Sequence, residues 1–506
     1  MTLARIHTRA ALGIAAPYVT VEAHISAGLP ALTIVGLPET TVKESRDRVR
    51  SAIINSGYTF PARKITINLA PADLPKEGSR YDLPIAIALL AASEQLSATA
   101  LNQYEFIGEL ALTGAMRGVC GAISSAIQAS HAGREMIVPQ DNEAEVGLID
   151  GPGCYVAGTL LEVCAILEGK QPPLRPRAPD PTPAEQAEDL RDIIGQEQGK
   201  RALEITAAGG HNLLFIGPPG TGKTMLATRL IGLLPPLTLS EALESAAIKS
   251  LADNRELAAT WRQRPFRAPH HSASLNAMVG GGRIPLPGEI SLAHNGVLFL
   301  DELPQFERRA LDALREPIET GEIHLSRTRA KIHYPARFQL IAAMNPSPGG
   351  HYQGELNRST PGQILRYLSR LSGPFLDRFD ITLEVPLLAP GMLSQGHTAG
   401  ETSATVRERV IQARALQLAR QHKLNAQLSS QEVNALCPLE KPDARWLEEA
   451  ITQLGLSIRA WQRILKVART IADLAGAEQL EKKHLQEALS YRAMDRLLIH
   501  LQKQLA

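Results

Sequence analysis

One segment in the middle of the chain has the residue types and spacing of a phosphate-binding loop. It matches the pattern G-x-x-x-x-G-K-[ST] in full, with Gly217, Pro218, Pro219, Gly220, Thr221, Gly222, Lys223 and Thr224. Glycines let successive backbone amides curl around phosphate oxygens, and the helix start that follows adds its partial positive charge. In such a loop the lysine reaches the β- and γ-phosphates of ATP, and the threonine ligates Mg²⁺. The segment therefore predicts a site that binds ATP together with Mg²⁺.

Two carboxylates further along the chain have the arrangement that hydrolysis needs. Asp301 and Glu302 come directly after the apolar run 297–300. At the end of a buried strand, Asp301 is placed to hold Mg²⁺ through water, and Glu302 to polarise a water for in-line attack on the γ-phosphate. Asn345 follows the apolar run 340–343, where its side chain can orient the attacking water, the sensor-1 role. Alone, each signal also fits an ordinary loop or turn, but behind a phosphate-binding loop they predict ATP hydrolysis together.

The strands that must carry these groups are recognisable from their composition. Residues 213–216, 297–300 and 340–343 are short continuous apolar runs, which are typical of strands buried on both faces of a parallel sheet. The run 225–234 after the phosphate-binding loop favours a helix. A coincidental glycine-rich turn would lack both the entering strand and the leaving helix. We therefore expect residues 189–390 to form an α/β domain around a parallel sheet.

A proline-rich stretch separates this domain from the N-terminal part of the chain. Residues 171–183 contain six prolines in thirteen residues, which favours an extended, semi-rigid linker, and we place the linker at 171–188. Residues 1–170 mix short alternating strands with helix-like apolar stretches and predict an α+β domain. Residues 391–506 carry apolar residues at helical spacing and predict an all-α domain.

Composition excludes several classes of protein. Hydrophobic residues make up 44% and charged residues 21% of the chain, the balance of a water-soluble globular protein. Because the net charge is +1, binding of nucleic acid or a membrane surface would have to come from a local patch. The longest apolar run, 83–92, is about half of the roughly 20 residues that span a bilayer, so we expect no membrane partner. Four cysteines without metal-ligand or disulfide spacing favour a reduced cytoplasm.

Positive charge is concentrated in one short region, residues 321–337, whose sequence predicts a β-hairpin. Between residues 323 and 337 no side chain is acidic, and the basic ones are Arg327, Arg329, Lys331 and Arg337. Such a group can bind the phosphate backbone of DNA. The alternative interpretation is an ordinary solvated hairpin.

A second insertion, residues 265–295, is rich in glycine at 279–283 and contains adjacent histidines. His270 and His271 suggest metal binding, but no cysteine or carboxylate ligand set accompanies them. We expect a structural or interdomain role for both histidines.

The chain resembles the ComM/YifB family of magnesium-chelatase-related AAA+ ATPases, from its first strand to its C-terminal helices. Besides the phosphate-binding loop, the resemblance is carried by the segments DIIGQE (192–197), RPFRAPHH (264–271), LFLDE (298–302) and LDRFD (376–380). The resemblance implies an AAA+ P-loop core with a parallel sheet, followed by an all-α lid. It also implies that Ile194 contacts the nucleotide.

The same resemblance implies roles for two arginines. Arg378 matches an arginine finger, which would reach the γ-phosphate of a neighbouring subunit, and the alternative is a surface salt bridge with Asp377 or Asp380. Arg459 matches the sensor-2 arginine, acting either on its own subunit's nucleotide or on a neighbour's. An arginine finger needs a partner subunit, so the resemblance implies a homo-oligomeric ring, a hexamer.

The resemblance also implies a substrate for the motor. In related ring ATPases the hairpin lines the central channel, and the insertion 265–295 resembles a channel-facing element. We therefore expect a translocase on single-stranded or branched DNA, a helicase promoting branch migration in recombination. Two alternatives stay open: a chelatase-like or chaperone ATPase that remodels a protein partner, and an ATP-dependent protease.

The N-terminal domain bears on the protease alternative, because residues 71–83 and 108–114 resemble the Lon-protease-like (ribosomal S5 domain 2-like) fold. That fold uses a Ser–Lys dyad. Arg80 stands where the nucleophilic serine is expected, Ser79 is adjacent, and no lysine occurs between positions 76 and 170. Because covalent catalysis needs a nucleophile with a base in reach, we expect the domain to be catalytically inactive and to serve DNA binding or ring stability.

One departure from the family concerns zinc. Many members carry paired cysteines after the sensor-1 asparagine, spaced for a zinc ion. The matching positions here are Ser347, Gly349, Asn357 and Ser359. These groups cannot replace thiolates in a tetrahedral site, so we expect no zinc.

Overall fold

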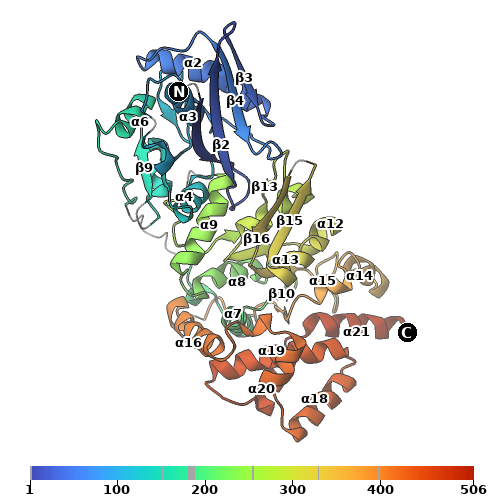
Figure 1. Ribbon diagram of the computed structural model, residues 1–506. Coiled ribbons are helices and arrows are strands. Elements are labelled where there is room, and N and C mark those ends of the chain that lie inside the picture. The colour runs from blue at the N-terminus through green and yellow to red at the C-terminus, as the bar shows by residue number, and fades with distance from the viewer. Residues whose placement is uncertain are drawn as a thin grey trace.

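The computed structural model describes residues 3–97, 99–149, 153–180, 188–253, 256–328, 330–395 and 399–506. An N-terminal region lies at the top of Figure 1, a central region in the middle and a helical C-terminal region at the bottom. Within the described ranges, no helix is both long and apolar enough to cross a membrane.

The N-terminal region is organised by a sheet whose described strands follow the order β3-β4-β2-β1-β5-β8-β9. β2 is antiparallel to β1 and β4. β5 runs parallel to β1, β8 parallel to β5, and β9 parallel to β8. Helix α3 lies against β1 and β2 and is buried along its whole length. The strands are β1 (Leu3–Arg9), β2 (Tyr18–Ser26), β3 (Ala31–Val35), β4 (Lys64–Ala70), β5 (Tyr104–Phe106), β6 (Glu109–Leu110), β7 (Met116–Arg117), β8 (Glu135–Pro139) and β9 (Cys154–Ala157). The helices are α1 (Thr40–Lys43), α2 (Ser45–Asn55), α3 (Asp82–Ala92), α4 (Ala122–His131), α5 (Glu143–Val146) and α6 (Leu160–Leu167).

The central region is built on a parallel sheet with the order β11-β14-β17-β10-β18 among its described strands. Alternate side chains of β10 belong to two different hydrophobic cores, Leu214 to one and Leu213 to the other, which explains its uninterrupted apolar sequence. The strands are β10 (Leu213–Ile216), β11 (Phe266–Arg267), β12 (Gly280–Gly281), β13 (Leu286–Pro287), β14 (Val297–Leu300), β15 (Glu322–Arg327), β16 (Ala330–Pro335), β17 (Gln339–Met344) and β18 (Ile381–Glu384). The helices are α7 (Glu197–Gly209), α8 (Lys223–Arg229), α9 (Leu239–Ala252), α10 (Leu275–Val279), α11 (Glu289–Leu292), α12 (Arg308–Asp312), α13 (Arg315–Thr320), α14 (Pro361–Leu368) and α15 (Gly373–Leu376).

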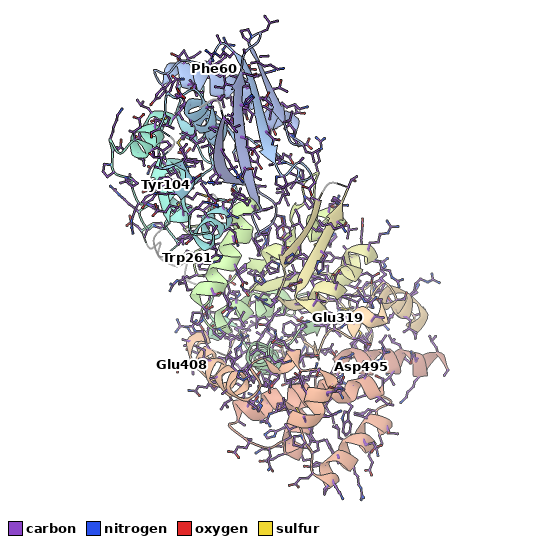
Figure 2. The ribbon with its side chains drawn as sticks, in the orientation of Figure 1. Phe60, Tyr104, Trp261, Glu319, Glu408 and Asp495 are labelled. Atoms are coloured by element: carbon purple, nitrogen blue, oxygen red, sulfur yellow. The ribbon has the colours of Figure 1, made fainter. Side chains whose placement is uncertain are left out.

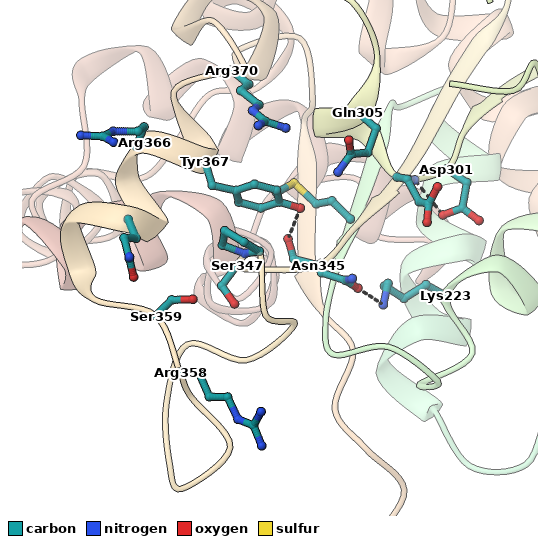
Figure 3. A pocket seen from close by; sticks show the side chains of 14 residues that line it. Lys223, Asp301, Gln305, Asn345, Ser347, Arg358, Ser359, Arg366, Tyr367 and Arg370 are labelled. Carbon is teal, nitrogen blue, oxygen red and sulfur yellow. Dashed lines mark hydrogen bonds between the residues drawn. The ribbon is translucent and has the colours of Figure 1, made fainter. Parts of the chain in front are cut away.

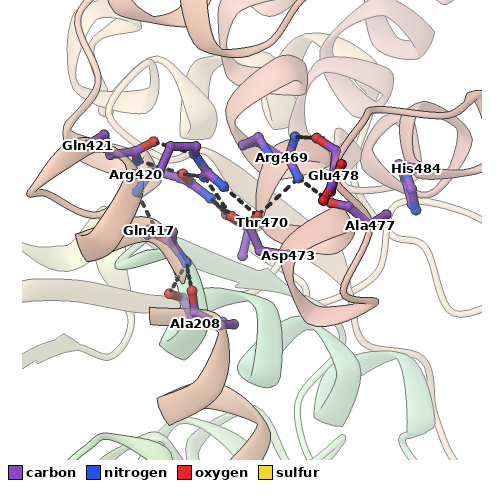
Figure 4. Close-up of polar contacts among 12 residues, drawn as sticks. Ala208, Gln417, Arg420, Gln421, Arg469, Thr470, Asp473, Ala477, Glu478 and His484 are labelled. Atoms are coloured by element: carbon purple, nitrogen blue, oxygen red, sulfur yellow. Dashed lines mark hydrogen bonds and ion pairs between the residues drawn. The ribbon is translucent and has the colours of Figure 1, made fainter. Parts of the chain in front are cut away.

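The C-terminal region is helical and packs beside the central sheet, with α19 touching α16, α20 and α7. A buried carboxylate, Asp473 of α19, holds it together: both of its oxygens accept hydrogen bonds from Arg420, each at 2.9 Å (Figure 4). Gln417 donates to Ala208 O at 2.9 Å and joins α16 to α7. Since breaking a buried ion pair costs about 3–5 kcal/mol, this network fixes the helices against the core. The helices are α16 (Ser403–Gln421), α17 (Ser430–Leu436), α18 (Lys441–Gln453), α19 (Ile458–Leu474), α20 (Lys482–Leu489) and α21 (Ala493–Leu505).

The first part of the proposed linker is docked on the N-terminal region. The Val156 amide donates to Leu174 O at 2.9 Å, and the Arg177 amide donates to Glu143 Oε1 at 3.0 Å. Residues 181–187 of the proposed linker lie outside the described residues. Residues 171–180 are therefore attached to β9 and α5 instead of standing free.

Candidate functional site

The phosphate-binding loop joins β10 to α8 and leaves an open cradle. Gly220 and Gly222 have φ angles of +79° and +90°, and nothing lies within 4 Å of a Cβ built on either. Gly217 is different, because a Cβ there would lie 2.3 Å from Val385 O. Positive φ at alternate positions turns backbone amides toward one side, which suits an anion. The loop therefore fits the phosphates of a nucleotide.

Lys223 points into this cradle. Its ammonium donates to Gly217 O at 2.7 Å, to Pro218 O at 2.8 Å and to Asn345 Oδ1 at 3.3 Å. Burial lowers the pKa of Lys223, an effect that the nearby Asp301 carboxylate opposes. An anionic phosphate beside the ammonium would favour its charged form further.

The two groups expected to hold Mg²⁺ are in contact. Thr224 Oγ1 donates to Asp301 Oδ2 at 2.8 Å, and Asp301 Oδ1 accepts from the Glu302 amide at 2.9 Å. Hydroxyl and carboxylate oxygens are the ligands that Mg²⁺ prefers, so the donor set fits this ion. The parallel sheet brings them together, because β10 and β14 end at the same edge.

Glu302 has an unusual backbone and a histidine partner. Its φ is +51° and its side chain is 63% exposed. His271 Nδ1 lies 3.1 Å from Glu302 Oε2, and the His271 ring lies against that of His270 with centroids 4.0 Å apart. His271 therefore contacts the candidate catalytic base, a contact that the expected structural or interdomain role did not include. No motif marks this pairing, since it arises only because β11 and β14 are neighbours in the sheet.

We expect the His271→Ala variant to lower kcat for ATP about 10-fold with little change in KM. Without the imidazole, the exposed Glu302 carboxylate samples several rotamers and is less often aligned with the attacking water. Steady-state ATPase kinetics measure the effect. His270→Ala is the matched control, because His270 Nδ1 is hydrogen-bonded to Ser272. His271→Asn, which keeps a hydrogen-bond donor, is expected to recover part of the rate. Equal losses of rate in all three variants would mean that His270 and His271 only support the fold.

Asn345 closes the site beside a cavity of about 650 Å³, large enough for a nucleotide. Figure 3 shows its side chain pointing to Lys223, while Tyr367 OH donates to Asn345 O at 3.3 Å. Three arginines also line this cavity: Arg358, Arg366 and Arg370. Among the described residues, no carboxylate lies within ion-pairing distance of any of them. Sequence reasoning missed them because they belong to no motif.

The segment around Ile194 lies against the phosphate-binding loop. Ile194 is half-buried, and the neighbouring Gln196 donates to Thr221 O at 3.0 Å and to Pro386 O at 2.9 Å. Gln196 has a φ of +54°. The contact with Thr221 ties this segment to the loop, and Gln196 is a residue that sequence reasoning did not single out.

Arg378 and Arg459 lie at the opposite edge of the sheet. Arg378 comes just before β18, and its carbonyl accepts a hydrogen bond from Asn212, just before β10, at 3.2 Å. These are the amino ends of the strands, whereas the phosphate-binding loop follows the carboxyl end of β10, roughly 13 Å away. Arg459, at the start of α19, lies 3.2 Å from Asp377 Oδ2. Neither guanidinium therefore reaches the phosphate-binding loop of its own subunit.

Arg378 has a different partner from those that the salt-bridge alternative named. It pairs with Glu319, which Figure 2 labels near the foot of the β15–β16 hairpin, the end at which Glu322 pairs with Pro335. Asp377 is bound instead by Arg459 and by Arg463, the latter at 3.3 Å, and Asp380 Oδ2 lies 2.8 Å from His211 Nδ1. Arg378 Nε is buried without a hydrogen-bond partner, so the side chain retains a free donor.

The basic hairpin forms, but its charges do not share one face. The register pairs Arg327 with Ala330 and Ser326 with Lys331, so Arg327 and Lys331 project from opposite faces. Both are exposed, and Arg327 donates to Asn276 Oδ1 at 3.2 Å. Arg329 lies outside the described residues. Arg337 is bound to Glu244 at 3.0 Å.

In the N-terminal region, Ser79 and Arg80 are engaged in separate contacts. Ser79 Oγ donates to a Glu109 carboxylate oxygen, and the buried Arg80 donates to Ser125 Oγ at 2.7 Å. Lys76 is buried with its ammonium bound to Gly36 O at 2.6 Å, and burial lowers the pKa of Lys76 to about 8. These contacts place a carboxylate, not a lysine, beside Ser79.

The loop after β17, for which we expect no zinc, is held by its own hydrogen bonds. Ser347 Oγ donates to His351 O at 2.6 Å, Asn357 donates to Tyr352 O at 3.1 Å, and the Ser359 amide donates to Asn357 Oδ1 at 2.9 Å. Protein hydrogen bonds thus order these positions.

Comparison with known proteins adds an independent line of evidence. Family models match three segments: magnesium chelatase, subunit ChlI, at 189–393; subunit ChlI of Mg-chelatase at 21–142; and magnesium chelatase, subunit ChlI C-terminal, at 400–492. YifB of Salmonella typhimurium is 71% identical over 506 residues, which cover 100% of both chains. Competence protein ComM of Haemophilus influenzae is 58% identical over 503 residues, which cover 98% of this chain and 99% of ComM. The magnesium-chelatase 38 kDa subunit of Cereibacter sphaeroides is 26% identical over 343 residues, which cover 59% of this chain and 90% of that subunit.

Proposed function

The chain belongs to the ComM/YifB family of magnesium-chelatase-related AAA+ ATPases, and we propose that it is a ring-shaped motor that hydrolyses ATP to move along DNA. Its specific role would be a helicase that promotes branch migration in recombination, acting on single-stranded or branched DNA. One observation carries the motor proposal: the groups for hydrolysis and the two arginines lie on opposite edges of one sheet. The name of the Haemophilus influenzae relative, a competence protein, supports a role with DNA.

Hydrolysis follows from the groups at the carboxyl edge of the sheet. Lys223 binds the β- and γ-phosphates, and Thr224 and Asp301 hold Mg²⁺, which when bound neutralises charge on the phosphate oxygens. Glu302 accepts a proton from the attacking water, and Asn345 orients that water. The 2.8 Å contact between Thr224 and Asp301 and the 3.3 Å contact between Lys223 and Asn345 support this arrangement.

A ring is needed because the site is incomplete in one subunit. Arg378 and Arg459 would each complete the site of a neighbouring copy, whose γ-phosphate a guanidinium can stabilise. Packing the amino edge of one sheet against the carboxyl edge of the next is a head-to-tail contact, which generates a ring when the rotation between subunits closes. We propose a hexamer. Action of Arg459 on the neighbour's nucleotide is supported by its contact with Asp377, beside Arg378.

The N-terminal region would support the motor without proteolysis. We propose that it has the Lon-like fold and is catalytically inactive. The buried Arg80 and the contact between Ser79 and Glu109 support this assignment, because a Ser–Lys dyad needs a lysine in reach of the serine.

We expect DNA binding to weaken when Arg327, Arg329 and Lys331 are all replaced by Ala. ATP binding is retained, since none of the three belongs to the nucleotide site. Every phosphate group that the variant no longer binds should flatten the plot of log affinity against log salt by about 0.7 to 0.9 units. The measurement is a titration of labelled DNA at several salt concentrations.

Arg337→Ala provides the matched control, because it removes one positive charge that is already bound to Glu244. Unchanged DNA affinity and salt dependence in the triple variant would make the hairpin a solvated surface. The alternative, an ATPase that remodels a protein partner as a chelatase-like or chaperone motor, would then be favoured. Similarity to the magnesium-chelatase 38 kDa subunit supports that alternative.

A further inference from the structure

The β15–β16 hairpin has one face that the protein does not cover. Ile323, Leu325, Ile332 and Tyr334 are buried on its inner face. The register places the other set of side chains on the outer face, which is exposed except for the half-buried Pro335: Glu322, His324, Ser326, Lys331, His333 and Pro335. Any ligand of the hairpin must therefore meet this outer face or the tip.

Two imidazole rings form a pair on the outer face. His324 and His333 are directly opposite each other in the register, with ring centroids 5.9 Å apart and planes inclined by 32°. The His324 side chain is 60% exposed, and His333 is also exposed. Aromatic side chains in this arrangement, next to a cation, are the elements of a stacking platform for unpaired bases.

Charge is distributed unevenly along this face. Lys331 lies toward the tip, as does Arg327 on the opposite face of the hairpin, whereas His324 Nε2 lies 3.7 Å from Glu322 and 4.0 Å from Glu316 at the foot. Carboxylates at the foot repel phosphates, and cations at the tip attract them. A nucleic-acid strand would therefore run its backbone past the tip and direct its bases toward the histidines.

The space beside one of the two histidines, His333, is also large enough for a base. The N-terminal region approaches β16 closely, because a Cβ built on Gly13 would lie 2.8 Å from Ile332 Cγ2. Between them is a cavity of about 340 Å³. Its walls include Tyr18, Pro71, Asp73, Pro75, Lys331 and His333. The cavity therefore lies along β16, between the hairpin and the N-terminal region, and His333 and Lys331 of the outer face border it.

We propose that His324 and His333 form a platform on which unpaired bases of single-stranded DNA stack, while Lys331 contacts the adjoining phosphate. This inference rests on the proposed function and deepens it, since it makes the motor sensitive to the bases as well as to the backbone. Every base has an aromatic face, so the platform favours single strands over duplexes without reading sequence.

The test compares two DNA probes of equal length and charge, a labelled oligothymidine and an otherwise identical oligomer of abasic sites. The full-length protein is titrated with each probe over a range of salt. We expect wild-type protein to bind oligothymidine roughly 10-fold more tightly than the abasic probe. His324→Ala/His333→Ala should abolish that difference by weakening only the oligothymidine complex, with an unchanged salt slope. Lys331→Ala should weaken both complexes and reduce both salt slopes by about 0.7.

His324→Tyr/His333→Tyr is the rescue variant, because it restores aromatic rings and is expected to recover the preference for oligothymidine. Melting temperatures of both double variants should match wild type, as the two histidines are on an exposed face. A double Ala variant that keeps the preference, or one that weakens both probes equally, overturns the platform and leaves DNA binding intact. Wild-type protein that binds neither probe, nor duplex or branched DNA, overturns the proposed function itself.

Discussion

The Lys223→Ala variant loses ATP binding, whereas the Glu302→Gln variant binds ATP and fails to hydrolyse it. Lys223 is the ammonium inside the phosphate cradle, and losing a charge-assisted hydrogen bond to phosphate weakens binding by roughly 10²-fold. Among the described residues, Glu302 contacts Asp301 and His271 but not the phosphate-binding loop, so its amide replacement removes the proton acceptor and leaves the cradle intact. General bases contribute about 10²–10⁴ to rate, and kcat should fall by that factor.

Binding of a fluorescent ATP analogue and release of phosphate measure the two effects separately. Glu307→Gln is the matched control, because Glu307 is an exposed carboxylate in the same segment that does not line the cavity. Near-normal turnover in the Glu302→Gln protein would contradict the assignment of the base. Tight ATP binding by Lys223→Ala would contradict the assignment of the cradle.

The Arg378→Ala variant retains ATP binding and loses about 10³–10⁵ in the rate of hydrolysis, the range known for arginine fingers. The physical reason is its position, since it lies at the sheet edge away from its own phosphate-binding loop. Mixing Arg378→Ala with Lys223→Ala subunits should restore part of the activity, because an intact cradle can then face an intact arginine. ATPase rates of mixed rings with confirmed stoichiometry provide the measurement.

Glu319→Gln separates the catalytic from the structural explanation of Arg378. It breaks the ion pair between Arg378 and Glu319 while leaving the guanidinium in place. If Arg378 only anchors α13, both variants should lose the same activity and mixed rings should not recover. If Arg378 acts on a neighbour, Glu319→Gln should keep most of the rate.

Local signals in the sequence were sufficient to locate the strands that carry the predicted nucleotide site. The runs 213–216 and 297–300 coincide with β10 and β14, and 340–343 lies within β17. A strand buried on both faces must be apolar throughout, so its composition reveals it without knowledge of its neighbours. The phosphate-binding loop is one continuous segment, so its pattern also needed no tertiary information.

Contacts between distant segments could not be predicted in the same way. His271 meets Glu302 only because β11 pairs with β14, and Arg378 meets Glu319 only because α13 lies near the start of β18. The sequence also showed that residues 323–337 are basic, but not that Arg327 and Lys331 face opposite ways. A one-residue change of register would exchange the two faces of the hairpin.

By itself, then, the sequence determined where the strands of the nucleotide site lie and predicted which residues bind ATP and activate water, because those roles depend on groups at the ends of recognisable strands. The tertiary structure alone decided which edge of the sheet each group occupies. It placed Arg378 and Arg459 away from the cradle of their own subunit, and it put His324 and His333 side by side on an uncovered face. The physical reason is that strand order and hairpin register are set by packing of the whole core, to which every segment contributes and which no short pattern encodes.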